Sequence, residues 1–317
     1  MKRSIYPIIL VVALALFVFA PLPIAAQDDT ITIGMVNYTL CCAYFIGMSD
    51  AVQNEAAAYP NIHVIVTDAN GDAEKLTSDV EDVLAQGVDG IIISGGPLEA
   101  APAALDAIKA AGVPVVLVDR QLKGGDYTSW IGPDNYQIGV QDGQYIVDRL
   151  GGQGTIVVLR GGPADNSIGL NRTNGMLSIV DPSDINVITA PDFGGWSEDG
   201  GFTLMEDLLA QNDQINAVFC ENDSMCLGAQ KAIDDAGRSS DIFLVAVDGQ
   251  KEALLQILNG TNYAATGLNN SDQIGRAAFN RLMAILAGAQ APHDTVLPSP
   301  VITSDNVIKF YDPNSVF

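Results

Sequence analysis

The chain has 317 residues, of which 48% are hydrophobic and 17% charged, and its formal net charge is −23 at neutral pH. This acidity argues against a protein that binds nucleic acid or an anionic membrane surface, because both are themselves negatively charged. The length exceeds one ordinary hydrophobic core and suits two lobes.

The first residues have the pattern of a secretory signal peptide. Lys2 and Arg3 form a positive start, Ile8–Ala20 is an unbroken apolar run, and Ala25-Ala26 provides small residues for cleavage. An uncleaved membrane anchor is the alternative, because a run extended through the following prolines approaches the ~20 residues that cross a bilayer. We predict export to a periplasm or cell surface and place residues 1–26 outside the fold.

In the first half of the chain, short runs rich in Ile and Val alternate with longer amphipathic stretches. The apolar runs are nearly continuous, which is typical of parallel strands covered by helices on both faces. We predict strands at Ile31–Val36, Ile62–Thr67, Gly90–Ser94, Val115–Val118 and Thr128–Ile131. We predict helices at Tyr44–Ala58, Glu74–Gln86 and Ala100–Ala111.

The second half repeats this rhythm, and the repetition predicts an α/β protein with two doubly wound, Rossmann-like lobes. Strands are expected at Thr155–Leu159, Asn186–Ile188, Ala217–Phe219, Phe243–Val247 and Ala264–Thr266, with two more in the tail at Val301–Thr303 and Val307–Tyr311. Helices are expected at Asn171–Ile179, Gly200–Ala210, Ser224–Ala236, Lys251–Asn259 and Ser271–Ala287.

In doubly wound sheets, ligands bind at the carboxyl ends of the strands. The residues that follow the predicted strands are mostly polar and often charged, and they include Asn37, Ser94, Asp119, Arg120, Arg160, Glu221, Asn222, Asp223, Asp248, Asn269 and Asn270. Nothing in this set resembles a catalytic arrangement.

Several short motifs occur in a characteristic order. They are Val113-Pro-Val-Val-Leu-Val-Asp119-Arg120, Asp134-Asn135, Asn171-Arg172-x-x-Gly175, the run from Ala217 to Ala229 that contains Glu221-Asn222-Asp223, Val247-Asp248-Gly249, and Asp272-Gln273-Ile274-Gly275. Together they resemble the ribose-type periplasmic sugar-binding proteins, which have the type I solute-binding fold shared with the effector lobes of LacI-like regulators. The resemblance covers about residues 31 to 300.

The resemblance implies sugar contacts in both lobes. In the first lobe the matching positions are Cys42, Tyr44, Phe45, Ser94, Asp119 and Arg120. In the second lobe they are Arg172, Trp196, Asn222 and Asp248, with Asn269 at the crossover between lobes. These residue types suit a sugar, because aromatic rings cover its apolar faces while Asp and Arg bind pairs of hydroxyls.

Some of these residues also have a purely structural interpretation. Phe45 and Trp196 could be ordinary core aromatics, although the glycines before Trp196 favour a loop. Asp119 could be a helix N-cap. Of the neighbours Asn222 and Asp223, we expect one to cap a helix while Asn222 faces the ligand.

The sequence departs from the ribose-type pattern at three polar positions. Cys42 and Ser94 stand where that pattern has amides, and Asn269 stands where it has Gln. Because a site that hydrogen-bonds a hydroxyl strongly rejects analogues without it, the ligand need not be ribose. Another monosaccharide, a deoxy sugar or a polyol fits equally well.

Four cysteines lie in the mature chain: Cys41, Cys42, Cys220 and Cys226. Export permits disulfides. The adjacent pair Cys41-Cys42 is either two free thiols or a strained vicinal disulfide, and Cys220 can pair with Cys226. The cysteine spacing matches no zinc pattern, and only two histidines are present, so we expect no metal and no cofactor.

The resemblance implies a non-enzymatic, extracytoplasmic solute-binding protein. Such a protein closes on a monosaccharide or polyol and delivers it to the membrane permease of an ABC transporter. We expect a monomer with no nucleic-acid partner. The lobes should be joined by a three-strand hinge near residues 131–134, 266–270 and 297–300. The first lobe then comprises residues 30–132 and 270–297, and the second residues 133–269 and 298–317.

Three rival functions share parts of this pattern. A receptor that presents bound sugar to a sensor kinase or chemoreceptor would have the same binding chemistry. A transcriptional regulator would need a DNA-binding headpiece where this chain has its predicted signal peptide. A carbohydrate-active enzyme could use a pair of carboxylates for hydrolysis, and the sequence does not exclude such a pair. The chain does, however, have no dinucleotide-binding glycine fingerprint after its first strand, no P-loop and no H-E-x-x-H motif.

Overall fold

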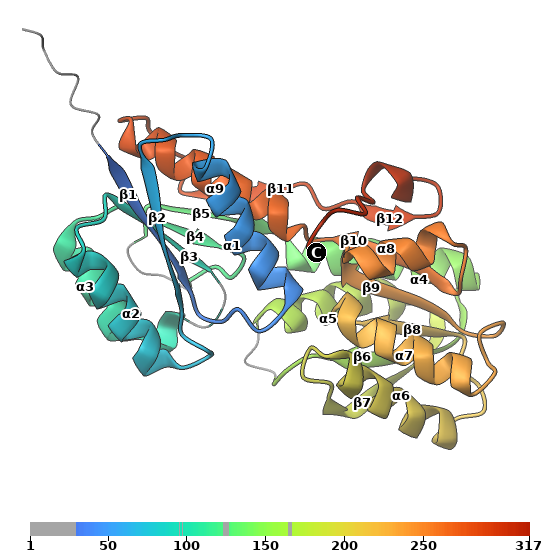
Figure 1. Cartoon of the computed structure of the whole chain (residues 1–317). Helices are drawn as coiled ribbons and strands as arrows, with labels where there is room; N and C mark the ends of the chain where they lie inside the picture. The colour runs from blue at the N-terminus through green and yellow to red at the C-terminus, as the bar shows by residue number, and fades with distance from the viewer. Residues whose placement is uncertain (1–29, 95, 97, 123–126, 164–166) are drawn as a thin grey trace, which may run out of the picture.

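The computed structural model describes residues 30–94, 96, 98–122, 127–163 and 167–317, so the predicted signal peptide lies outside the described residues. Two six-stranded sheets form two lobes side by side (Figure 1). This arrangement confirms the predicted α/β fold with two doubly wound lobes. Within the described part of the chain, no helix is long and apolar enough to cross a membrane.

The first sheet is parallel, with the strand order β11-β5-β4-β3-β1-β2. Its strands are β1 (Ile31–Asn37), β2 (Ile62–Asp68), β3 (Gly90–Ser94), β4 (Val115–Val118), β5 (Ser129–Pro133) and β11 (Asp294–Leu297). One face packs under α1 (Ala43–Ala56) and α9 (Ser271–Leu286). The other face packs under α2 (Ala73–Ala85) and α3 (Pro102–Ala111), which follows the short 3-10 helix η1 (Leu98–Ala100).

The second sheet has the order β12-β10-β9-β8-β6-β7, and β12 alone is antiparallel to its neighbour. Its strands are β6 (Gln153–Arg160), β7 (Asp184–Phe193), β8 (Ala217–Cys220), β9 (Phe243–Asp248), β10 (Tyr263–Leu268) and β12 (Val301–Thr303). One face is covered by α4 (Asn135–Leu150) and α5 (Ser167–Val180). The other is covered by α6 (Glu198–Gln211), α7 (Asp223–Asp235) and α8 (Lys251–Leu258).

The chain passes from one sheet to the other three times among the described residues. It leaves the first sheet after β5, returns after β10 into α9, and leaves again between β11 and β12. Most of the predicted ligand residues lie at or just after the carboxyl ends of β1, β3 and β4 in one lobe and of β7, β8, β9 and β10 in the other, as the rule for doubly wound sheets requires, while Arg172 lies within α5.

Three predictions of secondary structure were incomplete or wrong. The tail segment predicted as a strand at Val307–Tyr311 is instead a 3-10 helix, η2 (Val307–Lys309). The strand β11 was not predicted, because it has only four residues, Asp294–Leu297, at the sheet edge. The helix α4, whose Gly139 and Gly143 lower its helix propensity, was not predicted either.

The two glycines of α4 are explained by close helix packing. A β-carbon at Gly139 would lie 2.0 Å from the carbonyl oxygen of Arg172, and one at Gly143 would lie 2.7 Å from that of Met176. Both contacts are too short for any side chain, so only glycine lets α4 approach the backbone of α5. Tertiary packing therefore outweighs local propensity at this helix.

Helix α4 also carries a buried acid without a partner. Asp142 is fully buried against Gly267 of β10, and neither of its carboxylate oxygens has a hydrogen-bond partner among the described residues. Burial, and then the nearby charge of Asp223, raises the pKa of Asp142 well above its usual value. The folded protein therefore holds a proton at Asp142 that the unfolded chain releases above about pH 4.

Asp142 should make the protein less stable as pH rises. The free energy of unfolding falls wherever the folded state binds more protons than the unfolded state, by up to about 1.4 kcal/mol per pH unit for one group. Urea unfolding from pH 4 to pH 8 should show that Asp142→Asn is less sensitive to pH than the parent. Asp148→Asn, on the exposed side of the same helix, is the matched control and should keep the parent slope. Equal slopes for all three proteins would contradict this account.

Candidate functional site

A buried guanidinium lies at the centre of the site. The side chain of Arg172, on α5, is 3% exposed, and its Nη2 lies 3.0 Å from Oδ1 of Asp248. Its Nε donates to Oδ1 of Asn135 at 2.8 Å, and its Nη1 donates to the carbonyl oxygen of Glu221 at 2.6 Å. Three separate elements therefore supply acceptors to one cation, which compensates the cost of burying it.

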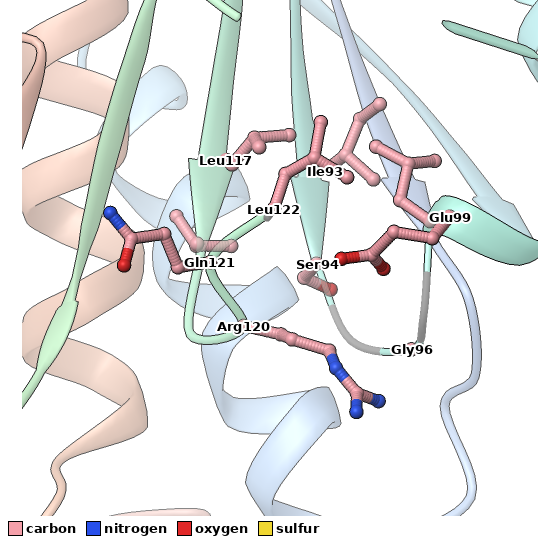
Figure 2. A pocket seen from close by; sticks show the side chains of 10 residues that line it. Ile93, Ser94, Gly96, Glu99, Leu117, Arg120, Gln121 and Leu122 are labelled. Atoms are coloured by element: carbon pink, nitrogen blue, oxygen red, sulfur yellow. The ribbon is translucent and has the colours of Figure 1, made fainter. Parts of the chain in front are cut away.

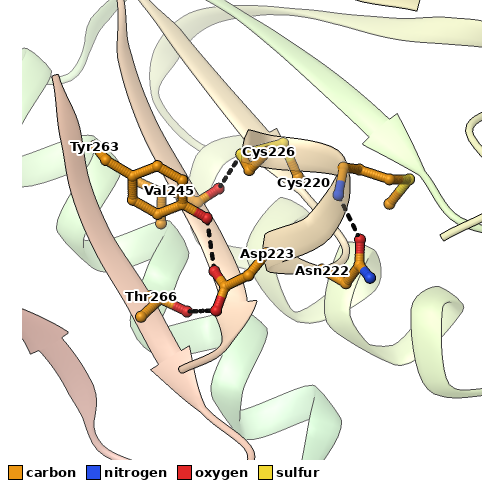
Figure 3. Close-up of a disulfide and its surroundings, with 8 residues drawn as sticks. Cys220, Asn222, Asp223, Cys226, Val245, Tyr263 and Thr266 are labelled. Carbon is orange, nitrogen blue, oxygen red and sulfur yellow. Dashed lines mark hydrogen bonds between the residues drawn. A yellow bond between two sulfur atoms is a disulfide. The ribbon is translucent and has the colours of Figure 1, made fainter. Parts of the chain in front are cut away.

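The second carboxylate of this group lies on a strained turn. Asp248, the last residue of β9, has a φ of 134°, a conformation that residues other than glycine rarely adopt. The next two backbone amides, of Gly249 and Gln250, each donate to Oδ2 of Asp223 at 2.7 Å. Asp223 also accepts from the hydroxyls of Tyr263 and Thr266 (Figure 3). This buried carboxylate holds the turn and so fixes where Asp248 lies.

A hydroxyl and an amide join the two lobes. Tyr44, at the start of α1, donates to Oδ1 of Asp119 at 2.7 Å, and its oxygen lies 3.1 Å from Oδ1 of Asn269. The Nδ2 of Asn269 donates in turn to Oδ1 of Asp248 at 3.2 Å. Five predicted ligand residues, namely Asp119, Tyr44, Asn269, Asp248 and Arg172, therefore form one continuous polar chain across the lobe boundary.

Burial shifts the pKa values of the acids in this chain upward. Burial raises the pKa of Asp248 to about 6, although the charge of Arg172 opposes the shift. Burial also raises the pKa of Asp119, against the hydrogen bond from Tyr44. Burial lowers the pKa of Arg172, but Asp248 and the other surrounding acids outweigh it and leave that pKa raised. The group therefore combines two buried acids, whose pKa values are raised, with one buried cation.

The aromatic residues of the prediction lie in both lobes. Phe45 is half-buried and packs edge-on against Tyr44, with ring centroids 5.2 Å apart. Trp196 is half-buried on a backbone with a φ of 61°. Its ring lies so close to Gly161 that a β-carbon there would come within 2.2 Å of it. Position 161, in the loop after β6, therefore has to be glycine, because any side chain there would displace the indole ring of Trp196.

The predicted division of roles between Asn222 and Asp223 is wrong. Asn222 is itself the N-cap of α7, since its Oδ1 accepts from the amide of Met225 at 3.0 Å, and its Nδ2 donates to the carbonyl of Trp196 at 3.3 Å. Asp223 is the buried acid that holds the turn after β9. Asparagine caps well because its short side chain reaches the free amides of the first turn. A ligand contact by Asn222 remains a prediction.

The loop that contains Asn222 is closed by a disulfide. Cys220, at the end of β8, is bonded to Cys226 in α7, with Cα atoms 5.5 Å apart (Figure 3).

Cys41 and Cys42 are free thiols on exposed residues, so the structure contains no vicinal disulfide between them. A hydrogen bond with Cys42 lowers the pKa of the Cys41 thiol to about 6. Cys42 occupies the N-cap position of α1 but makes no side-chain cap bond.

Two predicted residues of the first lobe differ in their surroundings. Ser94 is 1% exposed, and its hydroxyl donates to Oδ1 of the buried Asn37 at 2.7 Å. Arg120 is half-buried beside a hollow at the ends of β3 and β4, and it extends beyond the strand end, away from Leu117 and Leu122 (Figure 2).

Asp119, between β4 and Arg120, has a φ of 66° and caps no helix. Its N-cap interpretation is therefore excluded.

Two residues that had no assigned role in the sequence motifs complete the site. Asn135 is the first residue of α4 and accepts from Arg172, and it lay within the Asp134-Asn135 motif without an assigned role. Glu221 is 3% exposed and accepts from the amide of Gly161 and the hydroxyl of Thr173. Its position after β8 was the available signal. The described residues contain no group of three or more His, Cys, Asp or Glu that could hold a metal ion.

Removing Arg172 should be costly even without a ligand. In Arg172→Met, the carboxylate of Asp248 loses its buried partner, which costs about 3–5 kcal/mol of unfolding free energy. Arg120→Met is the matched control, because Arg120 is only half-buried, and it should cost less than about 1 kcal/mol. Urea unfolding of both variants measures the difference. Equal stability of the two would contradict the central role of Arg172.

Comparison with known proteins agrees with this fold. Residues 33–290 match the family model described as periplasmic binding protein domain. The ribose import binding protein of Bacillus subtilis is 34% identical over 257 residues, which cover 81% of this chain and 82% of that protein. The xylitol-binding protein of Mycolicibacterium smegmatis is 31% identical over 285 residues, covering 89% and 80% of the two chains.

The likeness extends to a solved structure. An ABC transporter solute-binding protein from Mycobacterium smegmatis with bound glycerol superposes with a TM-score of 0.82 at 29% identity, covering 90% of this chain and 98% of that one. The motifs that resemble ribose-type binding proteins thus lie within the matched region. The chain belongs to the periplasmic binding protein family.

Proposed function

We propose that this protein is an exported solute-binding protein that captures a monosaccharide or polyol between its lobes and delivers it to the permease of an ABC importer. The observation that carries the proposal is the polar chain from Asp119 through Tyr44, Asn269 and Asp248 to Arg172. It combines charged acceptors, a fixed cation and an amide at the carboxyl ends of strands from both lobes. The names of the relatives, which bind ribose, xylitol or glycerol, support this ligand class.

The geometry explains why such a site would bind rather than react. Arg172 and Asn269 contact the carboxyl group of Asp248, and the hydroxyl of Tyr44 donates to that of Asp119. These protein contacts fix the orientation of both carboxyl groups. Ionised carboxylates are strong acceptors for paired hydroxyls. A ligand hydroxyl can replace one of the bonds that these groups now make to one another, so the chemistry needed is exchange of hydrogen bonds.

Closing of the lobes would follow from the position of these groups. Asp119 belongs to the first lobe and Asp248 to the second, while Asn269 lies directly after β10, where the chain crosses over. A ligand bound to both acids stabilises the closed arrangement by its differential affinity for it. Phe45 and Trp196 would cover the apolar faces of a sugar ring. Export through the predicted signal peptide, action as a monomer and the absence of catalysis are part of the same proposal.

A ligand screen tests the proposal directly. Residues 27–317 should be melted against pentoses, hexoses, deoxy sugars and polyols. A ligand at 100 times its dissociation constant that binds only the folded state adds about 2.7 kcal/mol of stability. We expect a clear rise in melting temperature for one or two compounds. Asp248→Asn should lose this rise, whereas Asp305→Asn, at an exposed position, should keep it. No rise across the panel would place the ligand outside simple carbohydrates.

Small-angle scattering tests the closing step with the ligand that the screen finds. The radius of gyration should fall when the ligand is saturating, because the lobes come together around it. An unchanged radius would refute hinge closure while leaving the binding function in place.

Affinity should depend on pH through Asp248. Its pKa of about 6 means that the carboxylate is ionised at pH 7.5 and protonated at pH 5. Protonation removes a hydroxyl acceptor and the counterion of Arg172, so the affinity should fall about tenfold per pH unit below pH 6. Calorimetric titrations from pH 5 to pH 8 measure this profile. An affinity that stayed constant down to pH 5 would show that ligand binding does not require the ionised form of Asp248.

A further inference from the structure

The last residues of the sequence make a fourth passage between the lobes. After β12, Val307, Phe310 and Tyr311 pack on the core of the second lobe. The Nζ of Lys251 on α8, also in the second lobe, donates to the carbonyl of Ser315 at 2.6 Å. Phe317 is then 8% exposed within the core of the first lobe. Figure 1 accordingly shows this end of the chain between the two lobes.

In the first lobe, Phe317 contacts a predicted ligand residue. Its ring packs edge-on against Tyr44, with centroids 5.2 Å apart and planes at 78°. A β-carbon at Gly47, one turn along α1, would lie 3.3 Å from the β-carbon of Phe317, so glycine leaves room for the incoming chain. Because Phe45 packs on Tyr44 in the same edge-on manner, the Tyr44 ring is held by two aromatic neighbours.

The position of the Tyr44 ring determines where its hydroxyl lies. That hydroxyl contacts Asp119 in the first lobe and Asn269 at the crossover. Residues 312–317 therefore connect α8 of the second lobe to the residue that links both lobes in the polar chain. The match to the family model ends at residue 290, before this segment begins.

We propose that residues 312–317 form a strap that couples the two lobes, and that Phe317 is a positioning residue for Tyr44. The strap favours the closed arrangement, because separation of the lobes must break either the contact of Phe317 with Tyr44 or the bond of Lys251 to Ser315. The part of the proposal that concerns ligand lifetime rests on the proposed function. The coupling of the lobes does not depend on it.

The ligand-free protein tests the strap first. Phe317→Ala and Lys251→Met each break one end of it, and Lys251→Met does so without touching the core of the first lobe. Val316→Ala is the matched control, because Val316 lies in the same segment and is 50% exposed. We expect a larger radius of gyration in ligand-free scattering for the first two variants and the parent value for the control. A parent radius for both strap variants overturns the coupling, whether or not a sugar ever binds.

The positioning role is tested with the ligand found in the screen. Phe317→Ala should raise the dissociation rate constant about threefold to tenfold, the range of one aromatic pair, with little change in association rate. In a double-mutant cycle with Tyr44→Phe, which lacks the hydroxyl, this effect should largely disappear. Fully additive effects, or an unchanged dissociation rate in Phe317→Ala, overturn the positioning role. A parent protein that binds no sugar or polyol refutes the proposed function, and the scattering result then decides the strap alone.

Discussion

The buried charge of Arg172 is the constraint on which the site depends. A guanidinium that is 3% exposed must find acceptors in fixed positions, and here they come from the first residue of α4, the residue after β8 and the last residue of β9. Loss of one such partner costs several kcal/mol, which is a large fraction of the stability of an ordinary protein. The charge of Arg172 opposes the upward shift that burial imposes on the pKa of Asp248, and its Nη2 is one of the groups that orient this carboxylate.

Backbone strain is concentrated at the same strand ends. Asp119, Trp196 and Asp248 have positive φ angles, and each is held there by surrounding structure. Such conformations cost about 1–3 kcal/mol each and persist only where neighbours determine them. Asp223 binds the amides after Asp248, and the Cys220–Cys226 disulfide closes the adjacent loop. The side chains of these three residues therefore point in directions that an unstrained backbone at the strand ends would not allow.

The polar contacts that join the two lobes involve the same side chains that we propose bind the ligand. Tyr44 and Asn269 join the acids of the two lobes, so any ligand that exchanges bonds with them also changes the balance between open and closed arrangements. Coupling of this kind needs no separate relay. The aromatic contact of Phe317 with Tyr44 adds an apolar component to the same junction.

The sequence by itself determined the two α/β lobes and the strand ends that carry polar residues, because continuous apolar runs and glycine or proline stops depend on local physics. It also indicated Asp119, Arg172 and Asp248 through motifs whose order is characteristic. Only the tertiary structure decided that α4 is a helix, since Gly139 and Gly143 are required by contact with α5. Likewise, the cap role of Asn222, the clamp by Asp223, the partners of Arg172 and the insertion of Phe317 depend on residues far apart in sequence. No local pattern records such contacts.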